Sequence, residues 1–284
     1  MTTKSPFKDI IVEDKEKELR EHKKKQKSIG IATKTLNRLP IFEPSLKPQF
    51  RERTFENTYG RVFVRGRLGQ SHKNLLEVLL YKRKAYSSRK DEEGNRCFEV
   101  LYSEYDVRKY LSEGAAYSQE RYESLIEDLK QAYIEIETKD LTVKGELIMD
   151  KTLSTIYGKQ TKSNLPNLKG EEIPYAVLRF GAVLNLLISK ELKFSYNPKP
   201  ITQLDSGISQ AVVRFLLTHK RHPKAGYHLK ALLENLTKNI EGQAWKDIRR
   251  VLKKDANKLE SLGVVIDFKK DRLFVINNKI AIGC

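Results

Sequence analysis

The chain has 284 residues, and its 54 lysines and arginines outnumber its 37 aspartates and glutamates to give a net charge of +17. A basic excess of this size favours a polyanionic partner, of which nucleic acid is the commonest. Because no apolar run approaches the roughly 18 residues of a membrane span and the N-terminus lacks the apolar core of a signal peptide, we expect a cytoplasmic protein with no membrane association.

Residues 1–57 are predicted to form a charged N-terminal arm that is ordered only in part. Residues 13–27 are nearly all charged, so a helix there would lack an apolar stripe with which to dock. Pro40, Pro44 and Pro48 then break up any regular element.

A first folded domain is predicted over 58–155. Serines stand at three candidate N-cap positions, Ser71, Ser103 and Ser118, where a side-chain oxygen can accept a backbone N–H of the first helical turn. The helices that they open would continue to about residues 81, 111 and 132. Strands are predicted at 61–67 and 97–101, and a hairpin at 133–137 and 141–149.

A second domain is predicted over 173–284, after a linker at 156–172. Residues 176–187 are strongly apolar, and their length fits either a helix or a strand. Residues 192–196 alternate like a strand. The elements expected beyond them are helices at 209–219, 227–236 and 244–262 and a hairpin of 264–268 with 273–276.

The order of helix, helix, helix and hairpin therefore occurs twice. It is the order of the winged-helix variant of the helix–turn–helix, in which the third helix enters the major groove and the hairpin forms the wing. The expected fold class is α+β, with two tandem winged-helix domains behind a flexible charged arm. Residues 101–150 sum to −6 and residues 206–284 to +9. The second domain is thus the expected main DNA reader, while the first would dimerise or contact the DNA backbone.

The helix predicted at 244–262 carries the strongest functional signal. Its apolar residues, Trp245 among them, fall within one arc of a helical wheel, so Trp245 is expected to be buried against the helix at 209–219. The opposite face carries cations, whereas solvated helix faces usually mix both signs. Base contacts usually come from the N-terminal half of such a helix. The expected DNA-binding residues are Gln243, Lys246, Arg249 and Arg250 for bases and Lys253 and Lys254 for phosphates, with Asn257 further along the same face. The alternative is an ordinary amphipathic helix with a solvated basic face.

Further phosphate contacts are expected from a turn and from the wing of the second domain. These residues are Lys220, Arg221, Lys269, Lys270 and Arg272. Candidate backbone contacts in the first domain are Arg61, Arg65, Arg67, Lys82, Arg83 and Lys84. A solvated surface is an equally good interpretation of these six, since the helix at 118–132 exposes acids that would repel phosphate.

The sequence lacks the signatures of enzymes that act on nucleic acids. It has no GxxxxGK[ST] phosphate loop. His219 and His222 form an HxxH pattern without the neighbouring glutamate of a zincin. Two cysteines, Cys97 and Cys284, are too few for a disulfide framework or a zinc site. We therefore expect a non-enzymatic protein without a metal or a cofactor.

Three stretches resemble plasmid replication initiators of the TrfA and RepE type. They are SEYDVRKYLS (103–112), ESLIEDLKQAYIEI (123–136) and AWKDIRRVLKKDANKLESLGVVIDFKKDRLFVI (244–276). Members of that family bind direct repeats (iterons) at an origin, help to open adjacent AT-rich DNA and recruit a host initiator and helicase. The resemblance implies the same role here, with double-stranded DNA, host replication proteins and a second copy of the chain as partners.

One departure from that family concerns the clamp-binding peptide that some members carry. Gln203-Leu204-Asp205 continues here with Ser206 and Gly207, which puts binding to the clamp in doubt.

Two other functions remain open at this point. A winged-helix transcriptional regulator would bind a palindromic operator, because a palindrome mirrors a two-fold dimer. An RNA-binding or ribosome-associated protein would also be basic, but most aromatic residues here occupy core positions of the predicted elements rather than exposed stacking positions on a sheet.

Overall fold

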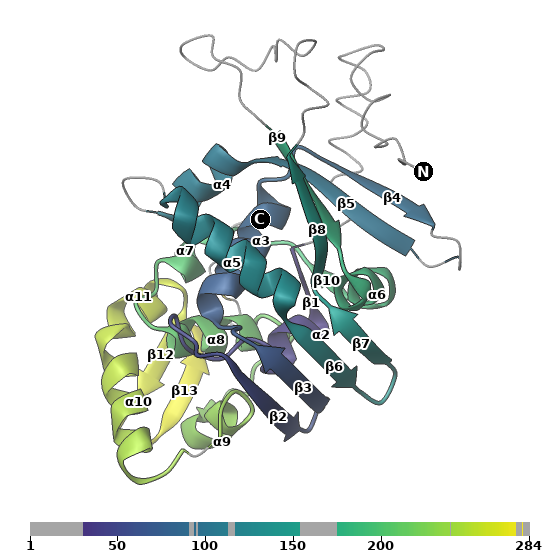
Figure 1. The fold of residues 1–284 in the computed structure, drawn as a ribbon. Helices are drawn as coiled ribbons and strands as arrows, with labels where there is room; N and C mark the ends of the chain where they lie inside the picture. The colour runs from purple at the N-terminus through teal and green to yellow at the C-terminus, as the bar shows by residue number, and fades with distance from the viewer. Residues whose placement is uncertain are drawn as a thin grey trace.

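A computed structural model describes residues 31–90, 94, 96–112, 117–153, 175–238, 240–276 and 280 (Figure 1). The charged stretch at 13–27 and the predicted linker at 156–172 lie outside these residues. Helices and strands are both abundant, as expected for an α+β chain. No helix in the described part is long and apolar enough to cross a membrane.

Two four-stranded antiparallel sheets form the first lobe, which we define as residues 31–196. Their strand orders are β2-β3-β6-β7 and β4-β5-β9-β8. The strands are β2 (Arg51–Asn57), β3 (Gly60–Gly66), β4 (Ala85–Lys90), β5 (Arg96–Ser103), β6 (Tyr133–Glu137), β7 (Thr142–Glu146), β8 (Ile148–Leu153) and β9 (Tyr175–Phe180). A smaller sheet pairs β1 (Ala32–Thr33) with β10 (Lys193–Phe194).

Helix α3 (Gln70–Tyr81) is buried almost throughout, from Gln70 to Leu80, and forms the central helix of the core. The other helices of this lobe are α2 (Lys34–Arg38), α4 (Glu104–Leu111), α5 (Gln119–Gln131) and α6 (Ala182–Lys190). Helices α4 and α5 pack against α3. Their predicted caps are confirmed, because the side chains of Ser103 and Ser118 accept backbone N–H groups of Asp106 and Arg121.

The start of α3 lies two residues before the prediction, which had Ser71 as the N-cap. The helix begins at Gln70, whose backbone N–H donates to the carbonyl of Ser45 over 2.8 Å. Gly69 precedes it, and a Cβ there would lie 2.4 Å from that same carbonyl oxygen. The approach of the two backbones therefore requires glycine at the N-cap, and Ser71 does not cap the helix.

The segment 31–57 belongs to the first lobe, although the sequence pattern assigned it to the arm. Ile31, Leu36 and Ile41 are buried in the core, and both β1 and β2 pair with other strands. The pattern is hard to interpret because prolines interrupt the apolar periodicity. The prolines here shape an irregular segment that packs on the core.

Residues 176–187 contain both a strand and a helix, which explains why their pattern fitted either. Strand β9 ends at Phe180 and α6 begins at Ala182. Gly181 joins them at a point where a Cβ would lie 2.4 Å from the carbonyl oxygen of Glu146. Only glycine fits this tight passage between β9 and α6.

The sheet pairing places the boundary between the lobes later than the predicted start at 173. Strand β9 lies between β5 and β8, so it completes a sheet of the first lobe. The predicted hairpin is present as β6 and β7, but it extends the sheet of β2 and β3. The first lobe therefore does not repeat the strand arrangement of the second.

The second lobe, residues 197–276, contains the predicted helices and the terminal hairpin in the expected order. Its elements are α7 (Lys199–Thr202), α8 (Gly207–Leu216), β11 (Tyr227–His228), α9 (Leu229–Glu234), α10 (Gly242–Lys254), α11 (Ala256–Ser261), β12 (Val264–Asp267) and β13 (Arg272–Val275). The three strands form one antiparallel sheet in the order β11-β13-β12.

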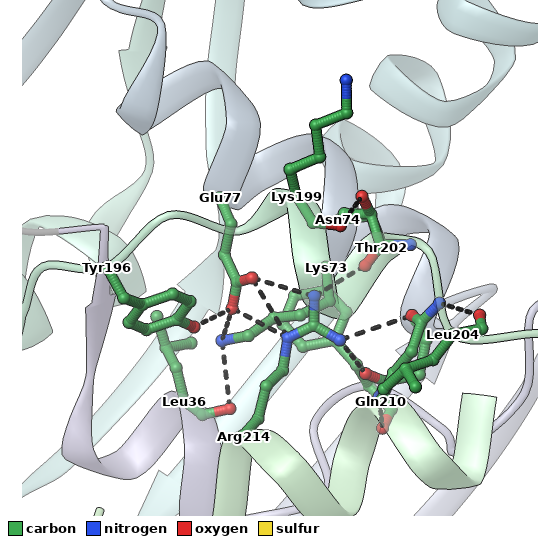
Figure 2. A network of polar contacts seen from close by, with 12 residues as sticks. Leu36, Lys73, Asn74, Glu77, Tyr196, Lys199, Thr202, Leu204, Gln210 and Arg214 are labelled. Carbon is green, nitrogen blue, oxygen red and sulfur yellow. Dashed lines mark hydrogen bonds and ion pairs between the residues drawn. The ribbon is translucent and has the colours of Figure 1, made fainter. Parts of the chain in front are cut away.

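A buried polar network joins the lobes where α8 packs against α3 (Figure 2). Arg214 of α8 is 2% exposed and Glu77 of α3 is fully buried. The guanidinium Nη2 lies 2.8 Å from the Glu77 carboxylate. Burial of both charges requires this pairing, so the network fixes α8 of the second lobe to α3, the central helix of the first.

Candidate nucleic-acid interface

Helix α10 lies on the outer side of the second lobe (Figure 1). Leu252 is buried, while Trp245, Ile248 and Val251 are partly buried against the core. The residues that point to solvent are Gln243, Lys246, Arg250, Lys253 and Lys254. The predicted division into an apolar and a basic face is therefore present in the structure.

The helix predicted at 244–262 is interrupted at Asp255. Helix α10 ends at Lys254 and α11 begins at Ala256. The Asp255 carboxylate is completely buried and accepts the backbone N–H groups of Asp205 and Ser206 over 3.0 and 3.1 Å. These bonds anchor the end of α10 to the start of α8. Because Asn257 follows the break, it lies on α11 and not on the basic face of α10.

Arg249 is turned toward the hairpin rather than outward. Its side chain is 27% exposed, whereas that of Arg250 is 70% exposed. Its guanidinium donates to the Asp271 carboxylate over 2.7 Å and also to the carbonyl of Phe268. It also lies over the Trp245 ring, 5.4 Å from the centroid. Arg249, predicted to contact bases, is thus engaged within the protein and holds the hairpin against α10.

Arg250 and Gln243 share an acidic neighbour that the helical wheel placed at the edge. Asp247 accepts from Arg250 Nη2 over 2.8 Å and from Gln243 Nε2 over 3.2 Å. An exposed pair of this kind contributes little free energy. Arg250 could therefore leave Asp247 for a base edge or a phosphate with little loss of free energy.

The β12–β13 hairpin presents two exposed lysines at its tip, Lys269 and Lys270. Their backbone N–H groups donate to the Asp267 carboxylate over 3.0 and 3.1 Å. The bond from Lys270 is the main cause of a lowered pKa at Asp267. Arg272 is partly buried and its guanidinium lies 3.4 Å from the Gly226 carbonyl oxygen. Both lysine side chains are exposed, with the Lys270 ammonium 4.0 Å from the Asp267 carboxylate, while Arg272 braces the base of the hairpin.

Trp245 is only partly buried, although its position in the apolar arc predicted a buried side chain. It packs at the edge of the core and is covered by the Arg249 guanidinium. Helix α10 contacts α8 as expected. The difference arises because Trp245 lies in the first turn of α10, beside the solvent-exposed Ala244.

Lys220 and Arg221 are both exposed in the turn between α8 and β11. His219 and His222 flank them, with ring centroids 6.3 Å apart. Among the described residues, no group of three or more histidine, cysteine, aspartate or glutamate side chains is arranged to hold a metal ion.

The first-lobe arginines of β3 stand in a surface that mixes both charges. Arg61 is exposed, and its register neighbours are Glu56 in β2 and Glu137 in β6. Arg65 is also exposed and lies over the ring of Tyr133, 5.5 Å from its centroid. Acidic neighbours on both sides of Arg61 weaken the attraction of this sheet for phosphate.

Arg67, which precedes α3, is exposed. The three basic residues that follow α3 instead form contacts within the protein. Burial lowers the pKa of Lys82, whose ammonium lies 4.4 Å from the centroid of the Tyr110 ring. Arg83 donates to the carbonyl of Leu80. Lys84 forms an ion pair with Asp106 at 2.8 Å. The exposed cations of α10 and of the hairpin tip therefore remain the candidate interface.

Two aspartates that position this surface, Asp255 and Asp271, were missed at the sequence level. The signal for Asp271 is its place between Lys270 and Arg272 at a hairpin tip. It has a positive φ of 50°, which aspartate tolerates better than most residues. Asp255 gave no signal of its own, because a lone acid in a basic helix usually faces solvent.

Comparison with known proteins identifies no family for this chain. No protein-family model matches the sequence, and no curated protein matches it. Among solved structures, the crystal structure of RctB domains 2–3 (RctB residues 155–483) aligns with a TM-score of 0.45 and 11% identity, covering 82% of this chain and 87% of that one. A similarity at this level establishes neither a family nor a function.

Proposed function

We propose that the protein binds double-stranded DNA through its second lobe, with α10 as the recognition helix in the major groove. The supporting observation is the exposed basic face of α10. The order of the elements around it and the three-stranded sheet β11-β13-β12 are typical of a winged helix. The β12–β13 hairpin then acts as the wing, and Lys269 and Lys270 contact the adjacent backbone. Lys220 and Arg221 are further candidates for phosphate contacts.

A charge-matched comparison tests this assignment. The variant K246A/R250A/K254A removes three exposed cations from α10, while K34A/K139A/K144A removes three exposed cations from the first lobe that are not among the predicted contacts. Both variants change the net charge equally, so any general electrostatic attraction falls equally. In a mobility-shift assay, the α10 variant should lose most of its duplex binding and the control should lose little. Equal losses would show that only net charge matters.

We further propose that the bound DNA is a set of direct repeats at a plasmid origin and that the protein initiates replication there without enzymatic activity. This part rests on the resemblance of three stretches of the sequence to plasmid initiators. Selection of binding sites from random duplexes followed by footprinting tests it. Direct repeats that support plasmid maintenance only with the intact protein would agree with the proposal. A single palindrome would favour a regulator.

The proposal includes the host initiator, the helicase and a second copy of the chain as partners. Light scattering of the free and DNA-bound protein would determine whether it dimerises. Pull-down with purified host initiator and helicase would test the other two contacts.

A further inference from the structure

The buried network between the lobes holds two cations and one carboxylate. Lys73, Glu77 and Arg214 are exposed by 1%, 0% and 2%. Figure 2 shows both cations beside the single carboxylate. A buried charge without compensation costs several kcal/mol, even after relaxation. A network with a surplus positive charge therefore needs a further source of compensation.

Lys73 carries the surplus, because Arg214 is fully engaged. Arg214 Nε and Nη2 meet the Glu77 carboxylate at 2.8–3.1 Å. The remaining guanidinium contacts go to the side-chain oxygens of Asn74, Gln70 and Gln210.

The ammonium of Lys73 has weaker partners. It lies 3.7 Å from the Glu77 carboxylate and donates to the Leu36 carbonyl over 3.2 Å. It also lies 5.3 Å from the centroid of the Phe42 ring. Burial lowers its pKa to about 8. An ammonium has three donors, and these contacts leave room for one more acceptor.

A small cavity of about 20 Å³ adjoins this ammonium. Its lining includes Asn37, Gln70, Lys73 and Arg214. Asn37 is 5% exposed, and no well-formed hydrogen bond to its side-chain nitrogen or oxygen is present within the described residues, although the amide lies near the Tyr196 hydroxyl. Buried amides with so little hydrogen bonding are rare in folded proteins. The cavity volume suits a single species of about the size of a water molecule.

We propose that this cavity binds one small monovalent anion of halide size, held by the Lys73 ammonium and the Asn37 amide nitrogen. The anion neutralises the surplus charge and accepts a hydrogen bond from each of the two nitrogens. The site joins α2, α3 and α8, so its occupancy stabilises the junction between the lobes. It is independent of the proposed DNA-binding surface.

The test uses the full-length protein without DNA and compares sodium bromide with sodium gluconate at equal ionic strength. Gluconate is too large for the cavity, so only bromide should raise the midpoint of thermal unfolding. At bromide concentrations well above the dissociation constant, the unfolding midpoint should rise by about 2–4 °C for each tenfold increase in bromide. K254A, which removes an exposed cation of α10, should keep the full bromide effect. K73M should lose it.

The isosteric variant N37D supplies an internal anion to the same cavity and keeps the test independent of how well K73M folds. In gluconate, N37D should unfold at a higher temperature than the wild type, and bromide should no longer stabilise it. In crystals grown with bromide, the wild type should show an anomalous peak between residues 37 and 73. The proposal is overturned if bromide and gluconate give equal midpoints, no peak appears and N37D is destabilised in gluconate.

Discussion

The Arg249 guanidinium donates to the Asp271 carboxylate over 2.7 Å and thereby joins the middle of α10 to the tip of the β12–β13 hairpin. The same guanidinium lies between the rings of Trp245 and Phe268, 5.4 and 5.9 Å from their centroids. The proposed recognition helix and wing are thus held in one relative orientation before any DNA is bound. Preorganisation of this kind lowers the cost of binding.

Arg249 should therefore act as a positioning residue. R249A should lower the free energy of unfolding by about 1–2 kcal/mol, since it removes a partly exposed charged pair. It should reduce DNA affinity without changing which base is preferred at any position. Chemical denaturation and binding to a panel of single-base variants of the site would measure both effects.

D271N provides the matched control for that prediction. Asparagine tolerates the positive φ at this position, so the backbone is retained while the charge is lost. In a double-mutant cycle, R249A and D271N should be strongly non-additive. Additive losses would mean that Arg249 acts through the DNA and not through Asp271.

Arg250 should read bases, whereas Lys254 should hold the backbone. Arg250 is exposed on the third turn of α10, where a guanidinium can pair with a guanine edge. R250A should cost about 1–3 kcal/mol of binding free energy and relax specificity at one or two positions. K254A should weaken binding to all sequences alike and reduce the slope of log K against log salt by about 1.

Titrations of specific and scrambled duplexes over a salt series separate these two roles. Parallel losses on both duplexes for both variants would indicate that α10 contacts only phosphate. Base recognition would then have to come from the wing lysines.

Glu77 should be the most sensitive member of the network between the lobes. E77Q leaves Lys73 and Arg214 buried without a carboxylate, so it should lower the free energy of unfolding by about 3–5 kcal/mol. R214M should cost less, because Lys73 and Glu77 then form a neutral pair. Urea unfolding of the two variants would establish the order, and a larger loss for R214M would contradict it.

The local elements were predictable from the sequence where one signal dominated. Ser103 and Ser118 marked helix starts, and the wing appeared as two alternating runs around a charged tip. The basic face of α10 was likewise visible on a helical wheel. These features depend on residues close together in the chain, whose spacing is fixed by helix and strand geometry.

The remaining features depend on partners distant in sequence. The place of β9 between β5 and β8 follows from sheet pairing across the segment at 154–174, which no local pattern encodes. The orientation of Arg249 depends on a carboxylate 22 residues later. The burial of Arg214 depends on the position of Glu77 on α3, 137 residues earlier in the chain.

Acidification should destabilise the turn that carries His219 and His222. His219 Nδ1 lies 3.1 Å from the Phe215 carbonyl, which can only accept, so this nitrogen carries the proton and Nε2 faces the Tyr59 hydroxyl at 3.3 Å. His222 Nδ1 lies 2.9 Å from the Tyr227 hydroxyl. Burial lowers the pKa of both imidazoles below their usual 6.5.

The sign of the pH effect follows from these lowered pKa values. Below pH 6.5 the unfolded chain binds protons that the folded protein resists, so the contribution of both histidines to stability is present above pH 6.5 and is lost as the pH falls. H219N/H222N retains a donor at the Nδ1 position but cannot titrate. Its unfolding midpoint should therefore fall less than that of the wild type between pH 7 and pH 5. H228N, at an exposed histidine, is the matched control and should follow the wild type. Parallel curves for all three proteins would show that these two imidazoles do not govern acid stability.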